Sequence, residues 1–128
     1  MRGAILLLLV LAGSACQSPG QAAKPEVIWH RLGSWSGAGN VQTESFESST
    51  GSLRVRWKTT NETTPGTGTF ELTINSSISG RPLQVAVDRK GIGGDTAYVQ
   101  EDPRVFFAEV KSANVEWAFT IEEAVTSR

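Results

Sequence analysis

Hydrophobic and polar residues alternate along several short segments of this chain. The clearest segment is LRVRWK at residues 53–58, in which every second residue is apolar and the others are basic. A second, FELTI at residues 70–74, repeats the pattern. A period of two residues places successive side chains on opposite faces of a β-strand. Each segment is therefore predicted to be a strand with one buried face and one face in water.

Six further segments have the same character, and turn-forming residues such as Pro65-Gly66 and the glycines of KGIGGD, residues 90–95, separate the segments. The six are residues 27–31, 43–46, 83–87, 97–99, 105–110 and 115–121. Seven to eight short strands without a helical pattern or an internal repeat predict an all-β fold, an antiparallel β-sandwich of the jelly-roll type. A small closed barrel is the competing architecture.

Two of these strands are expected to pair directly. Residues 53–58 and 70–74 are consecutive in the chain and separated by a turn-rich spacer, so we expect a hairpin. In that hairpin Arg54 or Arg56 would face Glu71 across the strands, a pairing that contributes a few tenths of a kcal/mol.

The tryptophans differ in their place in this pattern. Trp57 and Trp117 fall on the apolar side of alternating segments, which predicts that both are buried in the core. Trp35 lies in a Gly/Ser-rich stretch without a periodic partner, which predicts an exposed loop. There its indole would stack on a sugar ring or fill a partner's pocket, with Asn40 and Gln42 as nearby hydrogen-bonding groups. The competing interpretation is that Trp35 folds back to cap one end of the sandwich.

The N-terminus has a different composition. Arg2 is followed by an uninterrupted apolar run from Ala4 to Ala12, which has the layout of a secretory signal peptide and is shorter than the about 20 apolar residues of a membrane helix. Small residues, GSA at 13–15, then lead into Cys16. This arrangement resembles the signal of bacterial lipoproteins, with glycine in place of the leucine that is common three residues before the cysteine.

The resemblance implies that residues 1–15 are removed and that Cys16 carries a diacylglycerol on its sulfur and an acyl group on its new amino group. Several acyl chains, at about 0.8 kcal/mol per buried methylene, anchor a protein stably where one chain does not. Residues 16–25, CQSPGQAAKP, are then the lipidated cysteine and a flexible tether, and residues 26–128 are a single β-sandwich domain. Secretion with cleavage near Ala15 and a free thiol is the alternative.

Charge and cysteine content limit the classes of partner. Without Arg2 the chain has eleven basic and thirteen acidic residues, a net charge of −2. A near-neutral body gives no electrostatic case for binding nucleic acid or an anionic membrane surface. Cys16 is the only cysteine, so the body has no disulfide and no thiolate metal site. The membrane is thus expected as a partner only through the anchor at Cys16.

The sequence shows no constellation of residues that would make an active site or a metal site. GSWSG at residues 33–37 has tryptophan where a nucleophile elbow needs serine. The single histidine, His30, is expected to be a surface or structural residue at a strand end, with a role in a Ser-His-Asp triad as the alternative. We therefore expect no enzyme activity, no cofactor and no metal. A calcium ion held in loops stays open through four carboxylates whose spacing matches no calcium-loop pattern, namely Asp88, Asp95, Glu101 and Asp102.

Two stretches carry a second resemblance. Residues 37–46, GAGNVQTESF, followed by residues 51–57, GSLRVRW, resemble the opening of small CUB-like β-sandwich modules, and residues 104–110 with 112–117 are similar to their closing hairpin. The resemblance covers most of residues 34–123 and implies architecture. Modules of this class occur in bacterial lipoproteins and secreted proteins, and they usually bind proteins or carbohydrates. The disulfides and the acidic calcium site of many CUB domains are absent from this sequence.

These observations predict a non-enzymatic, lipid-anchored binding or accessory module of the cell envelope. We expect it on the extracytoplasmic face of the cell membrane or of the outer membrane, with an envelope protein or a glycan as ligand. A structural or assembly subunit of an envelope complex is an alternative, which would show an exposed strand edge or an apolar patch. A small hydrolase is the remaining alternative, and it requires His30 to lie against a serine and an aspartate.

Overall fold

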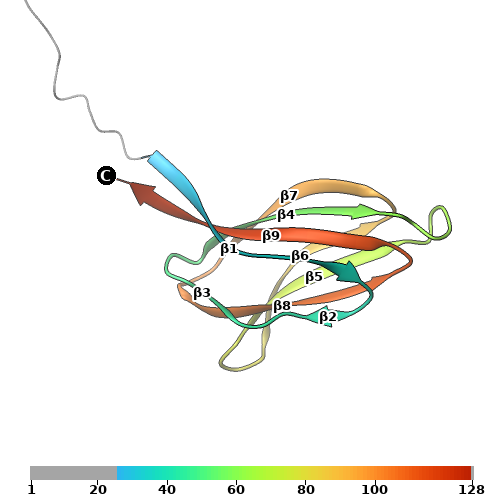
Figure 1. The fold of residues 1–128 in the computed structure, drawn as a ribbon. Helices are drawn as coiled ribbons and strands as arrows, with labels where there is room; N and C mark the ends of the chain where they lie inside the picture. Colours follow the sequence, from blue (N-terminus) through green and yellow to red (C-terminus); the bar gives the residue numbers. More distant parts are fainter. Residues whose placement is uncertain (1–25, 128) are drawn as a thin grey trace, which may run out of the picture.

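The computed structural model describes residues 26–127, and these form nine β-strands in two antiparallel sheets (Figure 1). The prediction of an antiparallel β-sandwich is confirmed, with nine strands in place of seven to eight. The expected signal peptide, Cys16 and the tether lie outside the described residues. The strands are β1 (Glu26–Ala38), β2 (Val41–Gln42), β3 (Phe46–Ser48), β4 (Ser52–Thr60), β5 (Thr69–Ser76), β6 (Pro82–Lys90), β7 (Gly93–Gln100), β8 (Arg104–Ala113) and β9 (Glu116–Ser127).

The two sheets have the strand orders of a jelly roll. Sheet A has the order β1-β9-β4-β7, and sheet B has the order β2-β8-β5-β6, with β3 also pairing with β8. Because β2 and β3 both pair with β8, they count as one interrupted strand, and the eight resulting strands have the orders 1-8-3-6 and 2-7-4-5. Among the described residues no ladder of backbone hydrogen bonds joins the two sheets, so the closed-barrel alternative is wrong.

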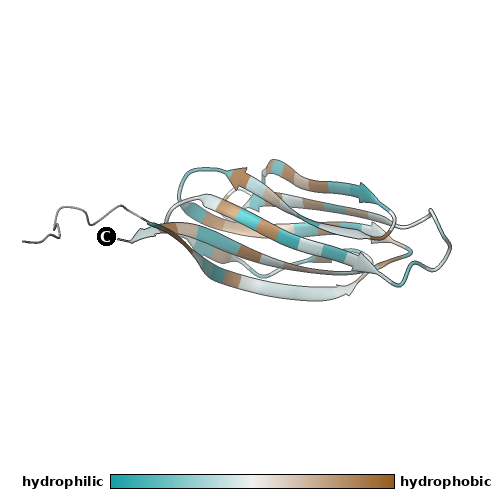
Figure 2. Ribbon diagram, turned by 90° about the horizontal axis from the view of Figure 1, so that it is seen from above, coloured by the Kyte–Doolittle hydropathy of each residue, from teal (hydrophilic) through white to brown (hydrophobic). Residues whose placement is uncertain are grey.

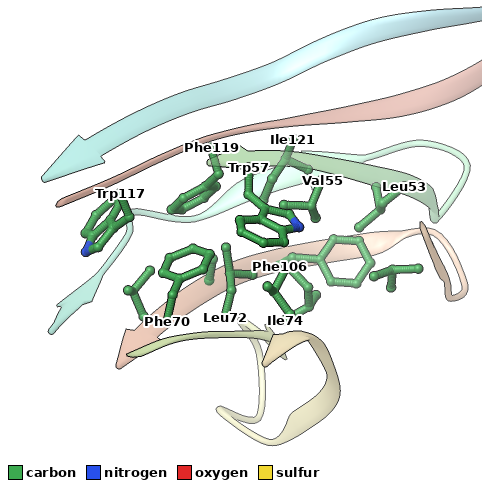
Figure 3. Packing of buried hydrophobic residues seen from close by; sticks show 14 of the residues in the cluster. Leu53, Val55, Trp57, Phe70, Leu72, Ile74, Phe106, Trp117, Phe119 and Ile121 are labelled. Atoms are coloured by element: carbon green, nitrogen blue, oxygen red, sulfur yellow. The ribbon is translucent and has the colours of Figure 1, made fainter. Parts of the chain in front are cut away.

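The core lies between the sheets and is built from the alternating apolar residues of both. The alternation is visible along the strands in Figure 2, and Figure 3 shows aromatic and aliphatic side chains from the two layers meeting in one cluster. Trp57 and Trp117 are buried as predicted, with 6% and 3% of their surface exposed. The Trp117 indole N–H donates to the Gly39 carbonyl at 3.0 Å, so its polar group is satisfied inside the protein.

The expected hairpin between residues 53–58 and 70–74 is wrong. These segments are β4 and β5, which belong to different sheets and pack face to face, with the Trp57 and Phe70 ring centroids 5.7 Å apart. Glu71 therefore faces Lys111 and Asp88 on sheet B, and the arginines of β4 face other strands. Both strands bury their apolar faces against each other across the core. Their backbone hydrogen bonds are therefore made with other strands, those next to each of them in its own sheet.

β1 is much longer than the predicted strand at residues 27–31. Its pairing with β9 shifts register between Arg31 and Gly33, so Leu32 forms a β-bulge that breaks the period of two. The strand continues after the bulge, and Trp35 lies within it, opposite Phe119. The expected loop position of Trp35 is therefore wrong. Figure 1 also shows the first part of β1 and the end of β9 side by side at one end of the molecule, in agreement with their register.

The predicted strand at residues 43–46 is wrong except at Phe46, which begins β3, because residues 43–45 lie between β2 and β3. In this segment Thr43 makes hydrogen bonds to β8 that a regular strand pairing would otherwise provide. Its N–H donates to the Ala108 carbonyl at 2.9 Å, and its hydroxyl accepts from the Ala108 N–H at 3.0 Å. A side chain thus completes the hydrogen bonding that an uninterrupted strand would have made.

Candidate binding face on sheet A

The outer face of sheet A is formed by the residues that alternate away from the core. On β4 these include Arg54, Arg56 and Lys58, the basic residues of the LRVRWK segment. Register places them beside Glu122, Thr120 and Ala118 of β9, and beside Tyr98, Thr96 and Gly94 of β7. The alternation that buries Trp57 on one side therefore presents a row of cations on the other.

Glu122 occupies the centre of this face and is buried beneath two arginines. Its side chain is 10% exposed, and its Oε1 lies 2.6 Å from Arg54 Nε and 3.2 Å from Arg56 Nε. Arg31 is its cross-strand partner on β1. A buried carboxylate needs such charge-assisted hydrogen bonds to offset its desolvation. The pairing fixes both guanidinium groups relative to the sheet.

Two aromatic side chains pack above this ion pair. The Arg54 Cζ lies 4.3 Å from the centre of the Trp29 ring, and the Trp29 and Tyr98 rings are 6.1 Å apart at 56°. Tyr98 is 65% exposed, and Trp29 is half-buried. We call Trp29, Arg54, Tyr98 and Glu122 the Trp29 cluster, and each of the four strands of sheet A contributes one residue to it.

The face continues along β9 as two adjoining open depressions that share Ala118. One, of about 450 Å³, is lined by Arg56, Lys58 and Thr120 and in part by Trp35, Trp57 and Phe119, and the other, of about 440 Å³, by Ser36 and Thr60 among others. They exist because Ala118 and Thr120 are small while their β4 neighbours are long. We call this continuous surface the β9 groove.

This face carries a positive charge although the chain as a whole has a net charge of −1. Alternation and register place four cations on it, Arg31, Arg54, Arg56 and Lys58, against the two acids Glu116 and Glu122. Among residues 26–127, Arg31 and Lys58 have no ion-pair partner. The face is therefore suited to a negatively charged ligand, which the whole-chain charge does not reveal.

The three residues predicted from sequence as a ligand site do not gather in one place. Trp35 is half-buried against the core, with its ring 5.2 Å from Phe119, and its indole N–H donates to Glu44 Oε1 at 3.1 Å. This bond holds the pKa of the exposed Glu44 carboxyl below its ordinary value. Trp35 thus packs on the core, as the alternative interpretation has it, but from within β1 and not as a loop residue that caps one end of the sandwich.

Asn40 and Gln42 lie together, but at the β2 edge of sheet B and without Trp35. Both line a depression of about 210 Å³ beside β8. The Asn40 side-chain oxygen accepts from the Ser112 N–H at 2.9 Å, so it fastens the β1–β2 turn to β8. Asn40 therefore has a structural contact. Because Trp35 is not an exposed loop residue, the reason for expecting Asn40 and Gln42 to bind a ligand together with it no longer holds.

His30 does not stand in the arrangement that a hydrolase requires. The Glu123 carboxylate lies between the histidine and a serine, with His30 Nδ1 3.6 Å from Oε2 and the Ser48 hydroxyl donating to Oε1 at 2.8 Å. In a triad the imidazole lies between the hydroxyl and the acid. The triad alternative is therefore not supported by the contacts of the described residues.

Glu123 instead fastens the β3–β4 connection to β9. Besides the Ser48 hydroxyl, the Ser49 N–H donates to Oε1 at 2.9 Å. Burial raises the pKa of Glu123, but the hydrogen bonds from Ser48, Ser49 and Thr50, with the His30 contact, together outweigh it and hold the pKa below its ordinary value. The carboxylate is thus ionised and structural at neutral pH.

The four carboxylates weighed for calcium are dispersed. Asp88 lies near the end of β6 and Asp95 near the start of β7, so both are beside the β6–β7 turn, as expected, but within strands. Asp95 pairs with Arg89 at 3.7 Å and Asp102 with Arg104 at 3.8 Å. In the described part of the chain, no three His, Cys, Asp or Glu side chains gather as a metal site would need.

Comparisons with known proteins give no assignment. No family model, no curated protein and no solved structure matches the chain. Residues 26–127 include no helix of the length and hydrophobicity that a membrane span requires.

Proposed function

We propose that this protein is a non-enzymatic, lipid-anchored binding module of the bacterial cell envelope, and that it binds its ligand on the outer face of sheet A. The Trp29 cluster is the observation that carries the proposal. Tryptophan, tyrosine and arginine are the residue types that contribute most to binding hot spots. Here they are held together by a buried carboxylate and lie beside an open groove.

The geometry favours binding because these side chains are positioned before any ligand arrives. Glu122 holds Arg54, and Arg54 in turn packs against the Trp29 ring. A ligand that contacts an already ordered side chain loses less conformational entropy than one that must order it. The arrangement supports recognition, whereas a reaction would need a nucleophile or an acid–base pair beside the same surface.

The N-terminal sequence supports the proposed location. The apolar run and the small residues before Cys16 resemble a lipoprotein signal, which would place the mature protein at the extracytoplasmic face of a membrane. Residues 17–25 would then separate the anchor from β1 by up to roughly 30 Å at full extension. The resemblance of residues 37–46 and 51–57 to CUB-like modules supports a binding role, since that class usually binds proteins or carbohydrates.

A structural subunit of an envelope complex is a second candidate, and the edge of sheet A favours it. β1 is an edge strand, and before its bulge Val27 and Ile28 are 61% and 49% exposed. A long strand edge with exposed apolar residues is a place where another chain can add a strand. In this role the contact would follow β1 and not the Trp29 cluster.

Photo-cross-linking in intact cells tests the proposed function. In separate variants a photoreactive amino acid replaces Tyr98 on the outer face of sheet A, Val27 on the β1 edge or, as the matched control, Val85, which is 52% exposed on β6. We expect high-mass adducts from position 98 and few from position 85. Equal yields from both positions, or adducts from position 85 alone, would show that the ligand binds elsewhere. Adducts from position 27 alone would favour the second candidate.

A further inference from the structure

We infer that the ligand of this face is an acidic polysaccharide, whose sugar rings stack on the Trp29 cluster and whose carboxylates pair with Arg56 and Lys58. The inference rests on the proposed function, because it names the chemical class of the ligand that the same face binds. Three properties of the face carry it: its aromatic rings, its unbalanced positive charge and its elongated open shape.

The aromatic rings provide stacking surfaces of fixed orientation. Trp29 packs against Arg54 at 4.3 Å and against Tyr98 at 6.1 Å, so its ring is held on two sides. Tyr98 leaves 65% of its surface in water. One face of a pyranose ring presents C–H groups that pack on an aromatic ring, while its hydroxyls stay hydrated at the rim. A ring with an apolar body and a polar tip suits such a contact.

The cations next to these rings have capacity for a further anion. Both arginines contact Glu122, and Arg56 reaches both of its oxygens, at 3.2 Å from Nε and 3.5 Å from Nη2; Arg56 is nevertheless 56% exposed, against 22% for Arg54, so the outer part of its guanidinium stays open to water. Lys58 has no ion-pair partner within the part of the chain that the structure describes. A guanidinium fork matches the two oxygens of a carboxylate, and a lysine adds a point charge beside it.

The groove is long enough to follow a chain. Side chains on one face of a strand repeat about every 6.8 Å, so Arg54, Arg56 and Lys58 span roughly 14 Å along β4. Beside them the β9 groove continues across Thr120 and Ala118 toward Thr60. Small-molecule sites are enclosed and mostly apolar. An open, elongated and polar groove instead fits one stretch of a polymer.

The charge of the whole protein favours a sparsely charged polymer over nucleic acid. Duplex DNA carries one negative charge per about 1.7 Å of helix axis. A molecule with a net charge of −1 repels such a polymer outside one small face. An acidic polysaccharide carries at most one carboxylate on most of its sugars, so charge and stackable rings occur together along the chain, which matches the aromatic and basic residues side by side on this face.

Binding of the full-length protein, purified from membranes in detergent, to matched polymers tests the inference. The probes are polygalacturonate and hyaluronate, the fully methyl-esterified form of polygalacturonate, and polyglutamate, and isothermal titration at 0.05 M and 0.15 M salt is the measurement. We expect at least one acidic polysaccharide to bind tenfold or more tightly than both the esterified polymer and polyglutamate. The esterified polymer lacks the charge, and polyglutamate lacks the sugar rings.

Variants locate the binding on the face. Tyr98→Ala and Lys58→Gln each change an exposed residue and are expected to weaken binding about tenfold. Lys111→Gln, an exposed lysine on the strand β8 of sheet B, is the charge-matched control and is expected to bind as the unaltered protein does. Equal weakening by all three variants would overturn the inference.

Several further results would refute the inferred class of ligand. Equal affinity for the esterified polymer would refute the carboxylate pairing, and equal affinity for polyglutamate would refute the stacking. Tighter binding to single-stranded DNA would show a different class of ligand. If neither acidic polysaccharide binds but adducts still form in cells at position 98, the inference fails and the proposed function stands. If both results are negative, both fail.

Discussion

Replacing Glu122 with glutamine should destabilise the protein because it leaves two arginines beside an uncharged amide. In the structure the Glu122 side chain is 10% exposed and Arg54 22% exposed, and the Nε–Oε1 distance is 2.6 Å. Removing one partner of a fully buried ion pair costs about 3–5 kcal/mol, whereas an exposed pair contributes about 0–1 kcal/mol. Arg54 is intermediate in burial, so we expect Glu122→Gln to lower the free energy of unfolding by about 2–3 kcal/mol.

Urea unfolding followed by circular dichroism measures this change. With a slope of about 1–3 kcal/mol per molar urea for a domain of this size, the midpoint should fall by between about 0.7 M and 3 M. Glu71→Gln is the matched control, because Glu71, like Glu122, lies on a strand opposite a cation, here Lys111, but has no ion pair of 4 Å or less within residues 26–127. Its expected change is within about 0.5 kcal/mol.

The double variant Arg54→Met with Glu122→Leu tests whether the loss of stability comes from leaving Arg54 buried without its partner. Replacing both members of a buried pair by apolar groups of similar size costs much less than removing one of them. We expect the double variant to be more stable than Glu122→Gln alone. If Glu122→Gln shifts the midpoint no more than Glu71→Gln does, the ion pair does not order the face and the proposed role of the Trp29 cluster loses its basis.

Three further outcomes are expected. The folded-state pKa of Glu123 lies below its ordinary value, so its stabilisation is fully present above that value and is lost as the pH falls through the folded-state pKa; Tm measured from pH 7 to pH 3 should fall less steeply in Glu123→Gln. Gly51→Ala should cost more than about 2 kcal/mol, because Gly51 has φ +75° and an added Cβ would overlap the Glu101 carbonyl oxygen, whereas Gly66→Ala, at φ +83° in open space, should cost only about 1–2 kcal/mol by urea unfolding. Cys16→Ala should move the protein from the membrane to the soluble fraction of cells, and unchanged fractionation would refute the lipid anchor.

Much of the secondary structure could be predicted from the sequence, because an amphipathic strand is recognised by its alternating apolar and polar residues. Residues 53–58 and 70–74 lie in strands, as does the segment predicted at 115–121 from Glu116 onward, and the apolar members of all three segments are buried as predicted. Alternation says which side of a strand is apolar, but it carries no information about which strands are neighbours. That is why the expected hairpin failed, and why a bulge at Leu32 hid the second half of β1.

Only part of the candidate binding face could be predicted from the sequence. The basic residues of LRVRWK indicated a wet side of β4 that carries positive charge, and the alternation at residues 115–121 put Trp117 on the apolar side, so the next polar residues of β9, Glu122 among them, lie on the outer face. The cluster, however, depends on register across four strands, which brings Trp29 and Tyr98 together from distant parts of the chain. Burial of Glu122 likewise follows from the arginines packed over it, so no local pattern could have revealed it.

Oxidative footprinting of the unaltered protein tests most directly whether the outer face of sheet A is occupied in the envelope. Hydroxyl radicals would label the protein in native membranes and, separately, after purification, with mass spectrometry of Tyr98, 65% exposed, and of Ile78, 87% exposed on the β5–β6 connection. We predict that oxidation of Tyr98 is several-fold lower in membranes than in the purified protein, while oxidation of Ile78 is unchanged. Equal labelling of Tyr98 in both samples would contradict the account.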